Sequence, residues 1–104
     1  MARRARLIWS EKAEADLDRV HLIISHRDSP KAARAFTRRI VAAAKRLRDY
    51  PEAGSPVEEF NDPTLRQTFV GSYRVIYRYR KPTIEILAVR HGAMLLREDD
   101  LRSE

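Results

Sequence analysis

Arginines recur at alternate positions of one predicted strand, residues 73–80, where they are suited to binding anions. Arg74, Arg78 and Arg80 project to one face, because side chains of a strand alternate between its two faces. The opposite face carries only large apolar or aromatic side chains: Tyr73, Val75, Tyr77 and Tyr79. Ile76 is the one apolar residue on the arginine side. A guanidinium binds phosphate or carboxylate through paired hydrogen bonds, so we predict that one face joins a core and the other faces anions.

Neighbouring strands add to this set. Arg66 begins the preceding predicted strand, and Arg90 ends the following one directly before His91. Arginines can stabilise the charge of a phosphoryl transition state, while His91 or Tyr77 can move a proton. Together they would support metal-free RNA cleavage by the RNA's own 2′-hydroxyl.

A structural alternative stays open for each of these groups. His91 can instead be hydrogen-bonded within a turn. Arg74 and Arg78 can pair with Glu85 on the adjacent strand and with an acidic loop over residues 51–63.

Composition restricts the remaining possibilities. The 104 residues contain no cysteine, which excludes disulfides, thiolate zinc sites, iron–sulfur clusters and cysteine nucleophiles. We find no glycine-rich phosphate loop and no His-Glu-x-x-His motif, and the three histidines are scattered, so we expect no cofactor and no metal. The net charge of +6 comes from 17 Arg and 4 Lys against 15 acids, which favours anionic partners. No apolar run reaches the ~20 residues of a membrane span, and we expect a cytoplasmic protein without a signal peptide.

The first half of the chain predicts a strand followed by two helices. Residues 5–9 form the strand, and Ser10 caps a helix that runs to about His26 with an apolar stripe of Ala13, Leu17, Val20 and Ile24. Ser29-Pro30 begins a second helix that ends near Tyr50, and its stripe includes Ala33, Phe36, Ile40 and Leu47. With about three residues between them, the helices should form an antiparallel hairpin.

The second half predicts an antiparallel meander. Residues 51–63 form an ordered acidic loop, and strands follow at about 66–70, 73–80 and 83–90. Gly71-Ser72 predicts a type II′ turn, and Lys81-Pro82 supplies the next connection. Residues 97–104 form either a short helix or an unfolded tail. We therefore predict a single α+β domain over residues 1–104, in which a short N-terminal strand precedes a helical hairpin packed on a small antiparallel sheet.

The order of these pieces resembles the ParE/RelE superfamily of type II toxin–antitoxin toxins. The matching segments span nearly the whole chain: Trp9-Ser10 to Ala13, Asp16-Leu17, Ala32-Ala33, Phe36 to Ile40, Leu47 to Pro51, Gly54, Leu65-Arg66, Tyr73 to Arg78, and Ile86 to His91. The His91-Gly92-Ala93-Met94 segment resembles the His-x-x-Met ending of ParE-like members, whose best-known action is inhibition of DNA gyrase.

This resemblance implies partners and a set of candidate residues. ParE-like toxins bind an acidic antitoxin that is partly disordered when free, and the basic and apolar surfaces suit such a partner. The residues expected to bind the target or the antitoxin are Arg66, Arg74, Arg78, Arg90, His91 and Met94.

Two alternatives remain open. RelE-like members cut mRNA on the ribosome, and here Arg74, Arg90 and His91 would be the catalytic residues. That pattern is incomplete, because no Tyr follows Tyr79 and Lys81 is the only lysine after Lys45. The third hypothesis is an inactive module that only binds the antitoxin.

Overall fold

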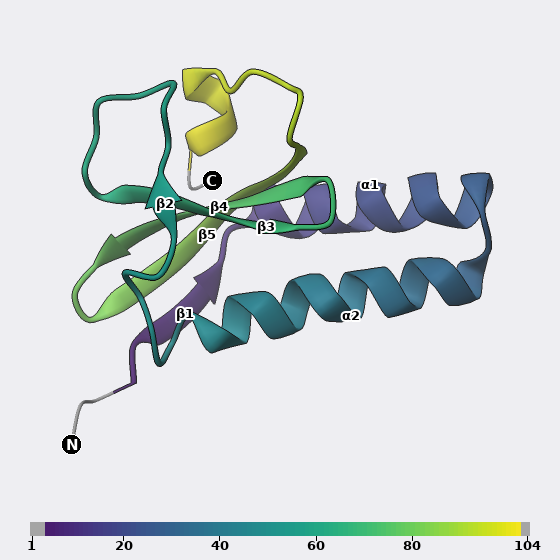
Figure 1. The fold of residues 1–104 in the computed structure, drawn as a ribbon, viewed down its shortest axis with the longest axis horizontal. Helices are drawn as coiled ribbons and strands as arrows, with labels where there is room; N and C mark the ends of the chain where they lie inside the picture. Colours follow the sequence, from purple (N-terminus) through teal and green to yellow (C-terminus); the bar gives the residue numbers. More distant parts are fainter. Residues whose placement is uncertain (1–3, 103–104) are drawn as a thin grey trace.

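The computed structural model describes residues 4–102 and confirms the predicted α+β class. The predicted tail continues to residues 103–104, which lie outside the described residues. Figure 1 shows a helical hairpin on one side of a sheet. In chain order the elements are β1 (Arg6–Trp9), α1 (Glu11–Arg27), α2 (Pro30–Arg46), β2 (Ser55–Pro56), β3 (Leu65–Val70), β4 (Tyr73–Arg80), β5 (Thr83–His91) and a 3-10 turn, η1 (Glu98–Leu101).

Both helices begin at the predicted serine caps. The Ser10 hydroxyl accepts from the Ala13 amide and the Ser29 hydroxyl from the Ala32 amide, each at 3.0 Å. Each helix has 17 residues. Within residues 4–102, no helix combines the length and apolar character needed to cross a membrane.

The second helix ends earlier than predicted, at Arg46 rather than near Tyr50. Arg48 explains part of this difference, because it exchanges two hydrogen bonds with Ala5: its carbonyl accepts from the Ala5 amide at 2.9 Å, and its Nε donates to the Ala5 carbonyl at 3.0 Å. The amides of Leu47, Arg48 and Asp49 bond carbonyls three residues back, which tightens the last turn. The chain therefore leaves the helix to meet the start of β1.

The sheet has the order β1-β5-β4-β3-β2. Strands β3, β4 and β5 form the predicted antiparallel meander, while β1 pairs in parallel with β5, so the complete sheet is mixed. Gly71 lies in the β3–β4 turn with a φ of 56°, a conformation that favours glycine. The acidic loop was predicted to contain no strand, but Ser55 and Pro56 pair with β3 as β2. Pro56 is tolerated there because β2 is an edge strand.

The helices cover one face of the sheet and bury the predicted stripes. Figure 1 shows the hairpin extending past the end of the sheet. Ile40, Val75 and Tyr77 are fully buried in this main core, where the odd-numbered side chains of β4 face the helices as predicted.

The opposite face of the sheet also carries a core, which was not predicted from the sequence. Its buried members are Val57, Leu65, Ile76, Leu87, Ala88, Leu96 and Leu101, with Phe60 packed against them. They come from the sheet, from the acidic loop and from residues 92–102, which we call the C-terminal segment. The loop and this segment therefore cover the arginine face. The expectation of a face directed only at anions is therefore wrong.

Candidate functional site

Arg74 lies at the centre of the covered face and is only 5 % exposed. Its Nη1 donates to Glu59 Oε1 and to Gln67 Oε1, both at 3.0 Å. Its Nη2 donates to Glu59 Oε2 at 2.7 Å and to the Met94 carbonyl at 2.6 Å. These four bonds join β4 to the acidic loop, to β3 and to the C-terminal segment. The guanidinium therefore holds these parts of the protein together.

Glu59 is the carboxylate that completes this arrangement. Its hydrogen bonds with Arg74 lower the pKa of the carboxyl from 4.5 to about 2, against the opposing effect of burial. The amide of Leu96 also donates to Glu59 Oε2, at 3.2 Å. Glu59 thus remains charged over a wide pH range and fixes the C-terminal segment against the sheet.

Arg78 shares the face of Arg74, as predicted, but a different carboxylate holds it. Its Nη2 lies 3.4 Å from Asp62 Oδ2, and its Nε donates to Thr64 Oγ1 at 3.2 Å. Hydrogen bonds from the Thr64 hydroxyl and amide, with the nearby Arg78, lower the pKa of Asp62. The acidic loop therefore neutralises both arginines. Among the described ion pairs, none involves Glu85, the other partner considered from the sequence.

Arg66 and Tyr77 lie on the helix side of the sheet. Arg66 Nη1 donates to the carbonyls of Glu52 and Gly54 at 3.0 and 2.8 Å. The Tyr77 hydroxyl donates to the Pro51 carbonyl at 2.8 Å and accepts from the Gly54 amide at 3.0 Å. Burial raises the pKa of Tyr77. Both side chains support the start of the acidic loop, and the buried Tyr77 is not placed to exchange protons with a ligand.

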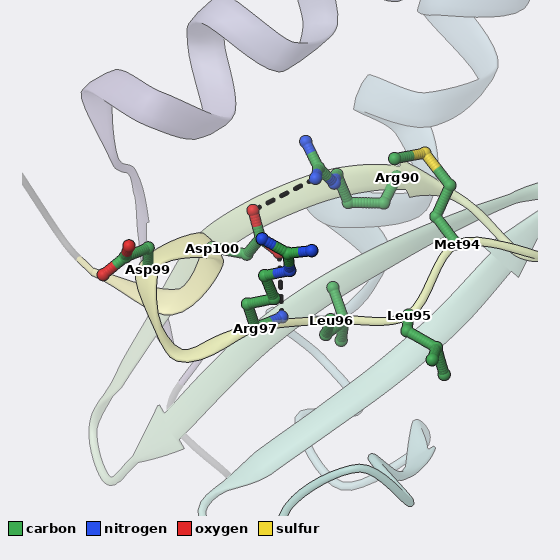
Figure 2. A pocket seen from close by; sticks show the side chains of 7 residues that line it. All are labelled: Arg90, Met94, Leu95, Leu96, Arg97, Asp99 and Asp100. Carbon is green, nitrogen blue, oxygen red and sulfur yellow. Dashed lines mark hydrogen bonds and ion pairs between the residues drawn. The ribbon is translucent and has the colours of Figure 1, made fainter.

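Arg90 faces the C-terminal turn, as Figure 2 shows. Its Nη2 lies 3.1 Å from Asp100 Oδ1, and Lys12 Nζ lies 3.6 Å from the same oxygen. Burial acts to raise the pKa of Asp100, but the Arg97 amide and these two cations outweigh it, and the pKa is lowered. Asp100 therefore anchors η1 to α1 and β5 by charge.

Asp16 is a further buried carboxylate, 2 % exposed, at the junction of α1 and β5. Its Oδ2 accepts from the Val89 amide at 3.0 Å and lies 3.6 Å from Lys12 Nζ. Neither Asp16 nor Asp100 was among the site residues predicted from the sequence. A signal existed for Asp16, since it lies three residues after Ala13 and thus beside the apolar stripe of the helix.

The three candidate catalytic residues do not converge. Arg74 and Arg90 are register partners on the covered face, whereas His91 is paired with Tyr73 on the helix face. The rings of His91 and Tyr73 meet edge to face at 5.5 Å, and His91 Nδ1 accepts from the Ala93 amide at 3.2 Å. His91 therefore bonds within its own turn, which is the structural alternative considered from the sequence.

Met94 is at the centre of the accessible part of the site. It is 48 % exposed, and Leu95 and Phe69 nearby are 79 % and 55 % exposed. We call Phe69, Met94 and Leu95 the Met94 surface. A pocket of about 700 Å³ lies on one side, lined by Arg90, Met94, Leu95, Leu96, Arg97, Asp99 and Asp100 (Figure 2). A second pocket, of about 360 Å³, is lined by Met94, Leu95, Phe69 and Arg74 among others.

These features define a small α+β protein with an exposed apolar surface at one end of the sheet and a sealed cluster of ion pairs beneath it. Residues 7–96 match the model of the family described as the ParE toxin of the type II toxin–antitoxin system, parDE. The chain therefore belongs to the ParE toxin family, and it is a type II toxin of the ParE/RelE superfamily with a cognate antitoxin as partner.

Individual proteins agree with this assignment. The chain is 33 % identical over 92 residues to Toxin RelE2 of Caulobacter vibrioides, covering 88 % of this chain and 99 % of that protein. It is 31 % identical over 91 residues to Toxin ParE3 of the same organism, covering 88 % and 90 %. A chain of the chromosomal ParDE system from P. aeruginosa has the same fold, with a TM-score of 0.74, 24 % identity, and coverage of 86 % and 98 %.

Proposed function

We propose that this toxin arrests growth in the cytoplasm by inhibiting DNA gyrase without catalysing a reaction, and that its antitoxin binds the Met94 surface. The observation that carries the proposal is the environment of Arg74. This side chain is 5 % exposed and is held by Glu59, Gln67 and the Met94 carbonyl. A guanidinium in this position is unavailable to a scissile phosphate, so the ribonuclease set lacks its central member.

The antitoxin assignment rests on the character of the exposed residues. Protein interfaces are built around apolar anchors with a polar rim. Met94 and Leu95 supply the anchors, and Arg90 and Arg97 line the adjoining pocket. An acidic segment that folds on binding can place apolar side chains on the Met94 surface and a carboxylate beside the exposed Arg97, since Asp100 already pairs with Arg90.

The test is a gyrase assay with the purified chain. We expect loss of supercoiling, with cleaved DNA trapped on the enzyme, and we expect the antitoxin to reverse both effects. The matched variant is Met94→Ser, which changes an exposed residue and should leave the fold intact while weakening the reversal by the antitoxin. Unchanged supercoiling and no trapped DNA with a folded chain would reject the proposal.

A ribonuclease is the second candidate, because one relative carries the name Toxin RelE2 and because Arg90 Nε has no hydrogen-bond partner within the described residues. Its test is the mapping of transcript 5′ ends after induction in a bacterial host. New ends without a DNA-damage response would favour this candidate. A folded chain that causes no growth arrest would leave only an antitoxin-binding module.

A further inference from the structure

The net positive charge of the protein is concentrated on a single helix. Helix α2 contains six of the 21 basic residues and no acid. The rest of the chain has 15 basic and 15 acidic residues and is therefore formally neutral. The net charge of the chain, +6, therefore equals the charge of α2 alone.

The cations of α2 differ from three arginines of the sheet in having no ion-pair partners within residues 4–102. Arg74, Arg78 and Arg90 form ion pairs with Glu59, Asp62 and Asp100, respectively. By contrast, the six cations of α2 are all exposed, and no ion pair within residues 4–102 includes any of them: Lys31, Arg34, Arg38, Arg39, Lys45 and Arg46. Among the elements of the described chain, α2 therefore carries the largest number of exposed cations without an ion pair, whereas the sequence pattern had favoured the sheet.

Four of these cations form a straight row along the outer side of α2. With 3.6 residues per turn, Lys31, Arg34, Arg38 and Lys45 fall within a sector of about 60°, whose centre lies about 130° around the helix from the buried residues Ala33, Ile40 and Ala44. We call these four residues the α2 row. At 1.5 Å per residue the row is about 21 Å long, on a rigid helix whose buried residues Ala33, Ile40 and Ala44 fix its orientation. In Figure 1, α2 lies along the lower right of the molecule, whereas η1 lies at the top.

We infer that the α2 row is a binding site for the phosphate backbone of duplex DNA, contacted without reading of sequence. Fixed cations along a rod match a rigid polyanion, and backbone contacts of this kind need no base recognition. The site is separate from the Met94 surface, so the inference goes beyond the proposed function.

The apolar residues argue against the two other polyanions. An acidic peptide that folds on binding needs apolar anchors, and none of the large apolar side chains exposed within residues 4–102 belongs to α2. The exposed Phe69 lines a pocket with Arg39 and Arg46, which lie outside the α2 row. Single-stranded nucleic acid needs exposed aromatic rings for stacking. The one aromatic residue of α2, Phe36, packs against Tyr73 at 5.7 Å and beneath Arg39 at 5.4 Å.

The experiment measures binding of the full chain to a fluorescent 30-base-pair DNA duplex by anisotropy, at several KCl concentrations. With four phosphate contacts, the logarithm of the association constant should fall with the logarithm of salt at a slope of about −3.6. The test variant changes Arg34→Gln, Arg38→Gln and Lys45→Gln. Glutamine is a good helix former, so α2 should persist, which circular dichroism checks.

The control variant changes Arg6→Gln, Arg80→Gln and Lys81→Gln, three exposed cations outside α2, and so removes the same net charge. We expect the α2 variant to bind at least tenfold more weakly at low salt and to lose about 3 units of slope, while the control keeps the wild-type slope. Equal losses in both variants would overturn the inference.

Polyglutamate and an unlabelled RNA duplex serve as competitors. If polyglutamate displaces the labelled DNA better than unlabelled duplex DNA at equal charge, the row belongs to an acidic protein and the inference fails. If the RNA duplex competes better than the DNA duplex, the assignment to DNA fails. Neither gyrase nor antitoxin is present, so the result is independent of the test of the proposed function.

Discussion

Glu59 and Arg74 form a bidentate ion pair, with Nη1–Oε1 and Nη2–Oε2 distances of 3.0 and 2.7 Å. The pair joins the acidic loop to β4, and both side chains are largely buried, because 6 % of the side-chain surface of Arg74 and 18 % of that of Glu59 is exposed. A buried charge that loses its partner is costly, so this contact is where the loop, the sheet and the C-terminal segment depend on one another.

Replacing Glu59 by Gln should therefore destabilise the protein strongly. The variant leaves the Arg74 charge buried, and breaking such a pair costs about 3–5 kcal/mol. We expect the lower end of this range, because the amide oxygen of Gln can still accept one hydrogen bond. Urea unfolding gives the free energy, and Glu58→Gln at the exposed neighbouring position is the control. Equal unfolding midpoints for the two variants would contradict this role for Glu59.

The ion pair between Glu59 and Arg74 should also make the stability of the protein depend on pH. The pKa of Glu59 is lowered from 4.5 to about 2 in the folded state, so its contribution is fully present above pH 4.5 and is lost as the pH falls toward 2. The free energy of unfolding of the wild type should thus decrease through this window more steeply than that of Glu59→Gln. Urea titrations at several pH values measure both slopes, and parallel curves would refute the linkage.

Asp16 should contribute through its bond to β5. In Asp16→Ala, the buried Val89 amide loses its acceptor, at a cost of about 1–3 kcal/mol. Asp16→Asn retains an oxygen that can accept this bond and should lose less. Hydrogen exchange at the Val89 amide gives a local readout, expected to be faster in Asp16→Ala. The control is Asp18→Ala at an exposed position of α1, and equal effects at both positions would argue against the bond.

Much of the fold could be predicted because local signals agree with the final packing. Ser10 and Ser29 cap the helices as expected, and the bounds of β4 are those predicted from its alternation. The second core could not be predicted in this way. Its covering residues, such as Val57 in the acidic loop and Leu101 in the four-residue η1, lie in segments too irregular or too short for periodicity to mark a buried position.

One bulge in β5 decides which face of the sheet Arg90 and His91 occupy. In the β4–β5 ladder Ile76 pairs with Ala88 and Tyr77 with Ile86, so Leu87 is an extra residue in β5. Such a bulge reverses which face the following residues occupy. It therefore places Arg90 on the covered face with Arg74, and His91 on the helix face. The sequence also could not show which acid of the loop meets Arg74, because a loop without periodicity sets no register.

A substitution on the Met94 surface should weaken antitoxin binding without changing the stability of the fold. Leu95 is 79 % exposed, so Leu95→Ser should change the free energy of unfolding by less than about 0.5 kcal/mol. If Leu95 anchors the antitoxin, the same change should weaken the complex by at least about tenfold, since central apolar contacts carry most of the energy of an interface. Leu22→Ser is the matched control, because Leu22 is 68 % exposed on α1, outside this surface. Calorimetric titration of each toxin variant with the cognate antitoxin measures the difference. Equal affinities for the two variants would show that the antitoxin does not bind the Met94 surface. A loss of affinity confined to Leu95→Ser would show that it binds there.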